Sequence, residues 1–175
     1  FTFYGGIYRD VSLLVVHKDH IALGHYGDTG VKVTPTLCKD HTADIRVETR
    51  LEGEGTVRVT LNDAEGNTVA AAEGKDVTMT LAHPHLWDGV KDPYLYTCVV
   101  ELEQGGEEVV DTVSTRVGVR SFRVDPKKGF FLNGRSYPLH GVSRHQDRKG
   151  LGNAISREMH DEDMTLIREL GANTI

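Results

Sequence analysis

The sequence has only two cysteines, one tryptophan and no long apolar run. Two cysteines do not make the disulfide framework of a small secreted domain, and no segment is long enough for a membrane-spanning helix. The 20 Lys and Arg residues are outnumbered by 26 Asp and Glu, and the net charge of −6 excludes a phosphate-binding basic surface. We therefore expect a globular protein of one or two domains that binds neither nucleic acid nor membranes. No basic-then-apolar leader is present, which is the basis for expecting a cytoplasmic location.

The two cysteines allow one alternative interpretation. Cys98 follows Tyr96 by two residues and lies 60 residues after Cys38, a spacing that is similar to that of immunoglobulin domains with a disulfide. Those domains place a tryptophan nearer the first cysteine, whereas Trp87 lies near the second. We therefore expect two reduced cysteines.

Alternating apolar and polar residues predict a series of short strands. Period-two alternation with one polar face is typical of antiparallel sheets packed on one side. Turn-forming residues such as Gly53-Glu54-Gly55 and Gly105-Gly106 separate the segments. The pattern predicts a mainly β protein built on an immunoglobulin-like antiparallel β-sandwich. The predicted strands are 31–34, 45–51, 57–61, 77–81, 95–102 and 109–119, with a further strand at 7–16 and a linker at 17–30.

The pattern changes after Arg120. Asn133-Gly134 between two apolar segments predicts a tight hairpin, and 141–154 is a polar loop. Ser156 can cap a helix that runs to about Leu170, with Gly171 as the stop. Residues 173–175 then begin a new apolar strand. A strand-loop-helix-strand order is the opening of a parallel α/β fold. One such unit cannot bury its own faces, so we expect the segment beyond Asp125 to be partly disordered or to adhere to neighbours.

His145 is the main candidate for a binding role. It lies in the predicted loop between a strand and a helix, with Arg144 beside it. In an α/β barrel such loops form the active-site face, where both side chains could hydrogen-bond the hydroxyls of a sugar. The alternative is a solvated loop histidine. No histidine pair has the spacing of a metal site, and no two carboxylates are placed for glycoside hydrolysis.

Several motifs occur in order along the chain. They are GGIYRDV at 5–11, preceded by Phe3-Tyr4; LW at 86–87 with PYLY at 93–96; VGVR at 117–120; FLNGR at 131–135; and GVSRH at 141–145. Over essentially its whole length the chain resembles the large β-galactosidases of glycoside hydrolase family two. The resemblance implies three segments: 1–19, the last strand of a sugar-binding jelly roll; 20–122, the sandwich; and 123–175, the first β-α unit of an incomplete (β/α)8 barrel.

The resemblance also implies a retaining β-galactosidase as the parent protein. Its two catalytic glutamates would lie on later barrel strands, so this chain has no catalytic residue and is expected to be inactive alone, with a structural sandwich. His145 matches a substrate-contacting position and Arg144 flanks it. Gln146 stands where the family often has Glu, and Ser143 where it often has Asn.

The expected cofactors and partners follow from the same resemblance. No cofactor or metal is expected in this chain, although Mg and Na are allowed in the parent enzyme. The expected partners are a carbohydrate substrate, the jelly roll and barrel of the same polypeptide, and a second copy in a homo-oligomer. Two alternatives stay open: a β-glucuronidase or β-mannosidase of the same family, and a non-catalytic carbohydrate-binding or scaffold module.

Overall fold

The computed structural model describes residues 5–23, 28–38, 40–106 and 108–175. The chain forms two compact units. One consists of Val15–Ser136, and the other combines the N-terminal residues up to Leu14 with Tyr137–Ile175. The segments expected at 1–19, 20–122 and 123–175 stay a prediction.

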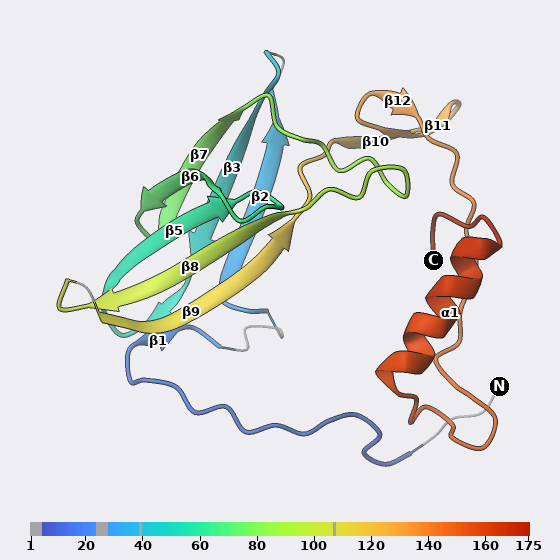
Figure 1. Ribbon diagram of the computed structural model, residues 1–175, viewed down its shortest axis with the longest axis horizontal. Coiled ribbons are helices and arrows are strands. Elements are labelled where there is room, and N and C mark those ends of the chain that lie inside the picture. Colours follow the sequence, from blue (N-terminus) through green and yellow to red (C-terminus); the bar gives the residue numbers. More distant parts are fainter. Residues whose placement is uncertain (1–4, 24–27, 39, 107) are drawn as a thin grey trace. The chain divides into compact units, whose positions relative to one another are not determined.

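The larger unit contains an antiparallel β-sandwich, which confirms the predicted fold class (Figure 1). Its first sheet has the order β2-β3-β7 and its second the order β6-β5-β8-β9. All pairings within both sheets are antiparallel. The strands are β2 (Val31–Leu37), β3 (Thr42–Thr49), β5 (Thr56–Asn62), β6 (Thr68–Glu73), β7 (Asp76–Ala82), β8 (Tyr96–Gln104) and β9 (Glu108–Val117).

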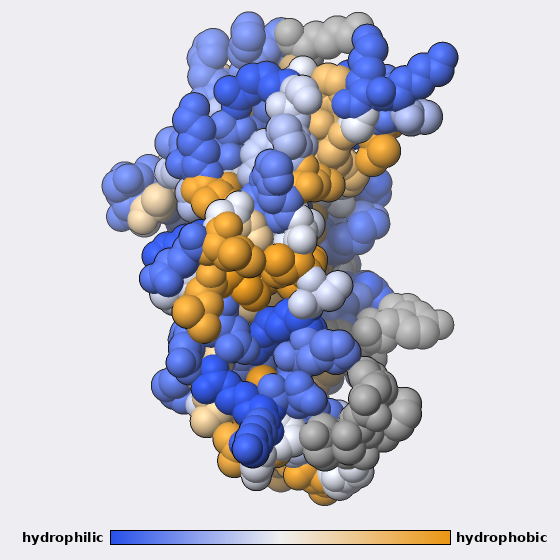
Figure 2. Space-filling view, turned by 90° about the vertical axis from the view of Figure 1, so that its right-hand side faces the viewer, coloured by the Kyte–Doolittle hydropathy of each residue, from blue (hydrophilic) through white to orange (hydrophobic). Residues whose placement is uncertain are grey.

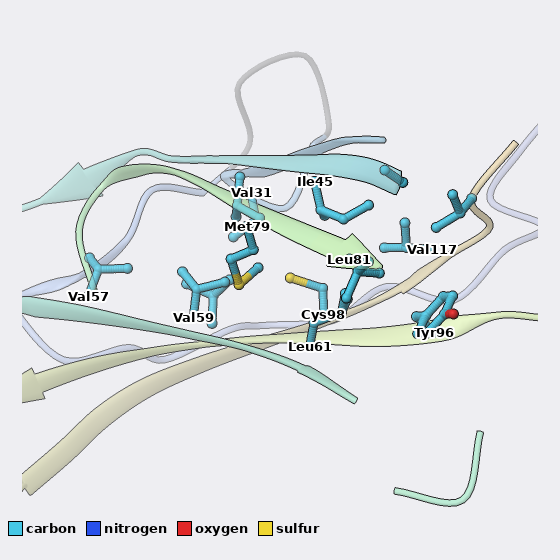
Figure 3. Close-up of a cluster of buried hydrophobic side chains, with 14 of the residues drawn as sticks. Val31, Ile45, Val57, Val59, Leu61, Met79, Leu81, Tyr96, Cys98 and Val117 are labelled. Carbon is cyan, nitrogen blue, oxygen red and sulfur yellow. The ribbon is translucent and has the colours of Figure 1, made fainter. Parts of the chain in front are cut away.

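The core lies between the two sheets and is made by every second residue of their strands. Ile45 of β3 and Met79 of β7 face Val59 of β5 and Cys98 of β8 across this space (Figure 3). Cys98 is fully buried, while Cys38 lies just after β2, and both are free thiols. Because successive side chains of a strand point to opposite faces, the alternation in the sequence places one apolar set inside.

β6 and β1 (His20–Ile21) are strands that the sequence pattern does not predict, and the segment predicted as one strand at 45–51 is divided between β3 and β4 (Leu51–Glu52). β6 is an edge strand with the sequence TVAAAE, whose alanines have little β propensity, and its pairing with β5 decides its conformation. β1 and β4 pair with each other over two residues, too short a length to give a periodic signal. β1 lies within the segment expected to be a linker, of which residues 24–27 are outside the described residues.

The prediction of a strand at residues 7–16 is wrong. These residues form no strand, and Ile7, Val11 and Leu13 expose 80% or more of their surface. A strand must pair its backbone groups with a neighbour, and these residues have no ladder partner. Their β-branched composition is therefore not sufficient to form a strand. Phe3 and Tyr4 of the same motif lie outside the described residues.

A three-stranded hairpin sheet follows the sandwich in the same unit. It consists of β10 (Phe122–Asp125), β11 (Gly129–Leu132) and β12 (Arg135–Ser136), in that order. Asn133 and Gly134 connect β11 to β12 with φ values of 49° and 78°. Two consecutive positive φ values are those of a type I′ turn, which Asn-Gly favours. The predicted tight hairpin is confirmed.

The smaller unit contains the helix α1 (Arg157–Glu169). The Ser156 hydroxyl accepts a hydrogen bond from the Met159 amide, and Gly171 follows the helix with a φ of 84°, so both predicted helix ends are confirmed. Gly141, before the helix, forms a parallel bridge with Thr174, after it. This bridge is the parallel β-α-β arrangement that the order of elements predicts.

Some apolar side chains remain on the surface of the molecule (Figure 2). Leu166 of α1 and Leu170, which directly follows the helix, are exposed by 57% and 74%, and the helix has no buried residue. Met164 and Leu170 are thus exposed and Ile167 is only half-buried, although their spacing of three residues places them on one face. Among the described residues, no helix combines the length and the apolar character needed to cross a membrane.

Candidate functional site

The loop at 141–154, called the GVSRH loop below, is held to α1 by ion pairs. The Arg144 guanidinium donates through Nε to Asp163 Oδ2 at 2.9 Å, and its Nη2 donates to the same oxygen. The Arg144 side chain is only 11% exposed, and Asp163 lies in the middle of α1. Two of its three nitrogens are thus paired with a carboxylate of the protein, and the geometry gives Arg144 a positioning role.

Arg148 adds a second attachment to the same helix. Its Nη2 lies 3.0 Å from Asp163 Oδ1 and 2.7 Å from Glu162 Oε2. Backbone hydrogen bonds between Arg148 and Gly152 close a tight turn, so this guanidinium fixes the turn as well as the helix. Asp163 therefore accepts from two arginines that belong to different parts of the loop.

The charges of this cluster stabilise one another. The hydrogen bond from Arg144, followed by that from Arg148, lowers the pKa of Asp163 below its ordinary value. The hydrogen bond with Glu162 raises the pKa of Arg148, and the hydrogen bond with Asp163 adds a smaller effect of the same sign. Asp163 thus stays ionised at neutral pH and keeps both arginines in place.

His145 is exposed and directly follows the anchored Arg144. Its backbone is fixed on one side by the ion pair with α1, while its side chain lies at the surface of the smaller unit. A ring at this place can donate or accept hydrogen bonds with a ligand hydroxyl, according to its tautomer. The predicted substrate contact of His145 stays a prediction, as does that of Arg144. The sequence pattern did not reveal Asp163 or Arg148, which are brought to the loop only by the fold.

Three of the family-like motifs meet at one place in the larger unit. Asn133 Nδ2 donates to the Trp87 carbonyl at 3.0 Å, and Asn133 Oδ1 accepts from the Ser121 amide at 3.0 Å. Arg135 Nη2 lies 2.6 Å from Asp88 Oδ2 and lowers the pKa of that carboxyl. The FLNGR turn is thus tied to the LW segment of the sandwich.

The VGVR segment completes this junction. The Arg120 guanidinium lies 4.9 Å from the centroid of the Trp87 ring, within cation–π distance. A Cβ added at Gly118 would come within 3.0 Å of the Trp87 Cβ, so the indole packs directly against the backbone there. The Trp87 amide donates to the Val119 carbonyl at 2.9 Å. The contacts at this junction explain why the VGVR and LW motifs have glycine, arginine and tryptophan at these positions.

Histidines in the larger unit have simpler surroundings. His85 Nε2 lies 2.7 Å from Asp92 Oδ2, and its ring stacks on Tyr94 with centroids 3.9 Å apart. His83 and His41 stack at 6.3 Å beside a shallow pocket. Within the part of the chain that the structure describes, no three His, Cys, Asp or Glu side chains gather as a metal site would require.

Comparison with known families decides the relationship. Residues 28–120 match the family described as glycosyl hydrolases family 2, and residues 123–175 match the TIM barrel domain of the same family. The chain belongs to glycosyl hydrolase family 2. The sandwich is the first of these two family 2 domains, and the hairpin, the GVSRH loop and α1 form the start of the second.

Individual family 2 proteins are similar over nearly the whole chain. It is 36% identical to a β-glucuronidase of Bacteroides fragilis, covering all of this chain and 27% of that protein. It is 35% identical to the β-galactosidase BoGH2A of Bacteroides ovatus, covering 97% of this chain and 21% of that protein. The solved FMN-binding β-glucuronidase from Facaelibacterium prausnitzii L2-6 has 37% identity and a TM-score of 0.86, covering 91% of this chain and 26% of that one. The chain thus spans about a quarter of the length of these relatives.

Proposed function

We propose that this chain is the sandwich and barrel-entry part of a retaining β-glycosidase that releases terminal β-D-galactose. The GVSRH loop carries the proposal, because Arg144 and Arg148 attach it to α1 and leave His145 at the surface. In family 2 the barrel is the domain that follows the sandwich, and loops after barrel strands form the active-site face. His145 would hydrogen-bond a hydroxyl of the sugar there.

The parent enzyme would use two carboxyl groups to stabilise an oxocarbenium-like transition state. A hydrogen bond from His145 to a ring hydroxyl would orient the sugar between them and become stronger as charge develops. In this scheme the sandwich holds its neighbouring domains in place and takes no chemical part. The 175-residue chain by itself is expected to hydrolyse no glycoside.

A β-glucuronidase is the second candidate. Two of the relatives above carry that name, and one is a β-galactosidase. A glucuronidase must offer a cation to the sugar carboxylate. In the GVSRH loop Arg144 and Arg148 are already paired with carboxylates of α1, which favours the neutral galactose for the part of the pocket that this chain forms.

The proposal extends to ions, partners and location. Mg²⁺ and Na⁺, where the intact enzyme uses them, would be held by its other domains. Its partners would be the carbohydrate substrate, the jelly roll and barrel of the same polypeptide, and a second copy of the enzyme. Two free thiols, Cys38 and Cys98, suit the reducing cytoplasm.

The test uses the full open reading frame that contains this chain. The purified protein is assayed with the nitrophenyl β-galactoside, β-glucuronide and β-mannoside. Cleavage of the galactoside in preference to the other two supports the proposal. Preference for the glucuronide establishes the second candidate, and no cleavage of any of the three indicates a binding or scaffold protein.

A further inference from the structure

Arg9, in the GGIYRDV motif near the beginning of the chain, reaches the GVSRH loop. Its Nη2 donates to Gln146 Oε1 at 3.3 Å, and its Nη1 donates to the Asn153 carbonyl. Gln146 and Asn153 lie 137 and 144 positions from Arg9 along the chain, and all three residues belong to the smaller compact unit. The two contacts join the two ends of the sequence.

The contact between Arg9 and Gln146 matters because Gln146 is a neighbour of His145 in the chain. Gln146 directly follows His145, and Arg144 directly precedes it. Arg144 is fixed by Asp163 of α1, and Gln146 is fixed by Arg9. The exposed His145 thus lies between two anchored neighbours: Arg144 is held by the Asp163 carboxylate, and Gln146 by the Arg9 guanidinium. Because two fixed peptide units restrict the residue between them, the direction of the His145 side chain depends on both anchors.

We propose that Arg9 is a positioning residue for sugar binding by His145. The inference rests on the proposed function and identifies a second element that holds the GVSRH loop. The planar guanidinium presents its donors as a fork, which suits two acceptors, Gln146 Oε1 and the Asn153 carbonyl. A lysine at this position would keep the charge but, as a single point charge, would not satisfy both acceptors in the same geometry.

A substitution at Gln146 can strengthen the contact with Arg9, whereas a substitution of Arg9 weakens it. A carboxylate accepts more strongly from a guanidinium than a neutral amide does. Gln146→Glu should therefore tighten the contact with Arg9, while Arg9→Ala should loosen it. The effect of Gln146→Glu should disappear when Arg9 is also replaced by Ala, because the added charge then has no partner.

The experiment has a structural readout and a kinetic one, both on the full open reading frame. Amide hydrogen exchange of residues 145–154 is compared for the wild type, Arg9→Ala, Gln146→Glu and the double variant. Lys149→Ala is the control, since it removes a charge from the same loop at an exposed side chain. Arg9→Ala should speed exchange by roughly tenfold and Gln146→Glu should slow it, whereas Lys149→Ala should leave it unchanged.

In the kinetic assay, Arg9→Ala should raise KM for the galactoside by roughly tenfold, and millimolar guanidinium but not ammonium should restore it. Unchanged hydrogen exchange in Arg9→Ala overturns the proposal. Faster exchange with unchanged KM and kcat also overturns it, because the anchor then has no effect on binding. If the wild type cleaves no glycoside, the proposed function is wrong, and so is the proposed role of Arg9 in sugar binding. Hydrogen exchange then shows only whether Arg9 holds the loop.

Discussion

The Asn133 amide donates to the Trp87 carbonyl at 3.0 Å, which joins the hairpin at the start of the barrel domain to the end of the sandwich. The two residues are 46 positions apart and lie in different motifs of family 2. The same side chain accepts from the Ser121 amide at 3.0 Å. One side chain thus satisfies two backbone groups at the junction between two domains.

Removing this side chain should destabilise the junction. Asn133 has a φ of 49°, which glycine adopts without strain, so Asn133→Gly deletes the amide and keeps the turn. We expect the free energy of unfolding, measured by urea denaturation, to fall by about 1–3 kcal/mol because two partly buried backbone groups lose their partner. An unchanged free energy of unfolding would show that water replaces the amide at no cost.

Gly118→Ala should weaken the same junction by a different route. The new methyl group would lie 3.0 Å from the Trp87 Cβ, closer than normal packing allows. Overpacking of this kind costs about 1–3 kcal/mol, and Trp87 fluorescence should report the displaced indole. Gly5→Ala is the matched control, because no atom lies within 4 Å of its added methyl and its φ is ordinary. Equal stability of the two variants would contradict the proposed packing.

Asp163→Asn should release the GVSRH loop from α1. The neutral amide is a weaker acceptor for Arg144 and Arg148, so amide exchange in residues 144–154 should become faster. Asp161→Asn, on the same helix, makes the same charge change and should have no effect on the loop. Comparable acceleration in both variants would mean that net charge, and not the ion pair, controls the loop.

The pH dependence of this attachment has a defined sign. The pKa of Asp163 is lowered in the folded chain, so the stabilisation is present above the ordinary value of 3.8 and is lost as the pH falls through the lower folded pKa. Loop exchange in the wild type, corrected for intrinsic rates, should therefore accelerate only in strong acid. The acceleration should be absent in Asp163→Asn, which has no carboxyl group at this position to protonate.

Burial raises the pKa of the Cys98 thiol to about 11, from an ordinary value of 9.0. The unfolded chain ionises first as the pH rises, so the stabilisation is present below pH 9 and is lost between about pH 9 and 11. Urea denaturation should show this loss in the wild type and a smaller one in Cys98→Ala. A thiol reagent should modify Cys38 in the folded protein and Cys98 only after unfolding.

The sequence predicts the sandwich well because its strands carry a strict period of two. Val57, Val59 and Leu61 predict the strand at 57–61, and all three are buried in the core of the structure. The same reasoning fails where pairing decides the outcome. Residues 7–16 have the composition of a strand but no partner, whereas β6 has weak composition and a partner in β5.

The candidate site could be predicted only in part for a similar reason. The loop and helix of His145 follow from local signals, the glycines and the Ser156 cap. Its anchors are contacts through space: Asp163 lies 19 residues from Arg144, and Arg9 lies 137 residues from Gln146. No periodicity records such pairs, so only the folded structure reveals that the loop is held from two sides.

The most direct test of the account is the kinetic effect of His145→Ala in the full open reading frame. We predict that kcat/KM for nitrophenyl β-galactoside falls by roughly tenfold or more, which corresponds to about 1.4 kcal/mol of lost transition-state stabilisation. Lys149→Ala, in the same loop, should retain the wild-type value. Unchanged kcat/KM in His145→Ala would contradict the account, because the GVSRH loop would then have no part in binding the sugar.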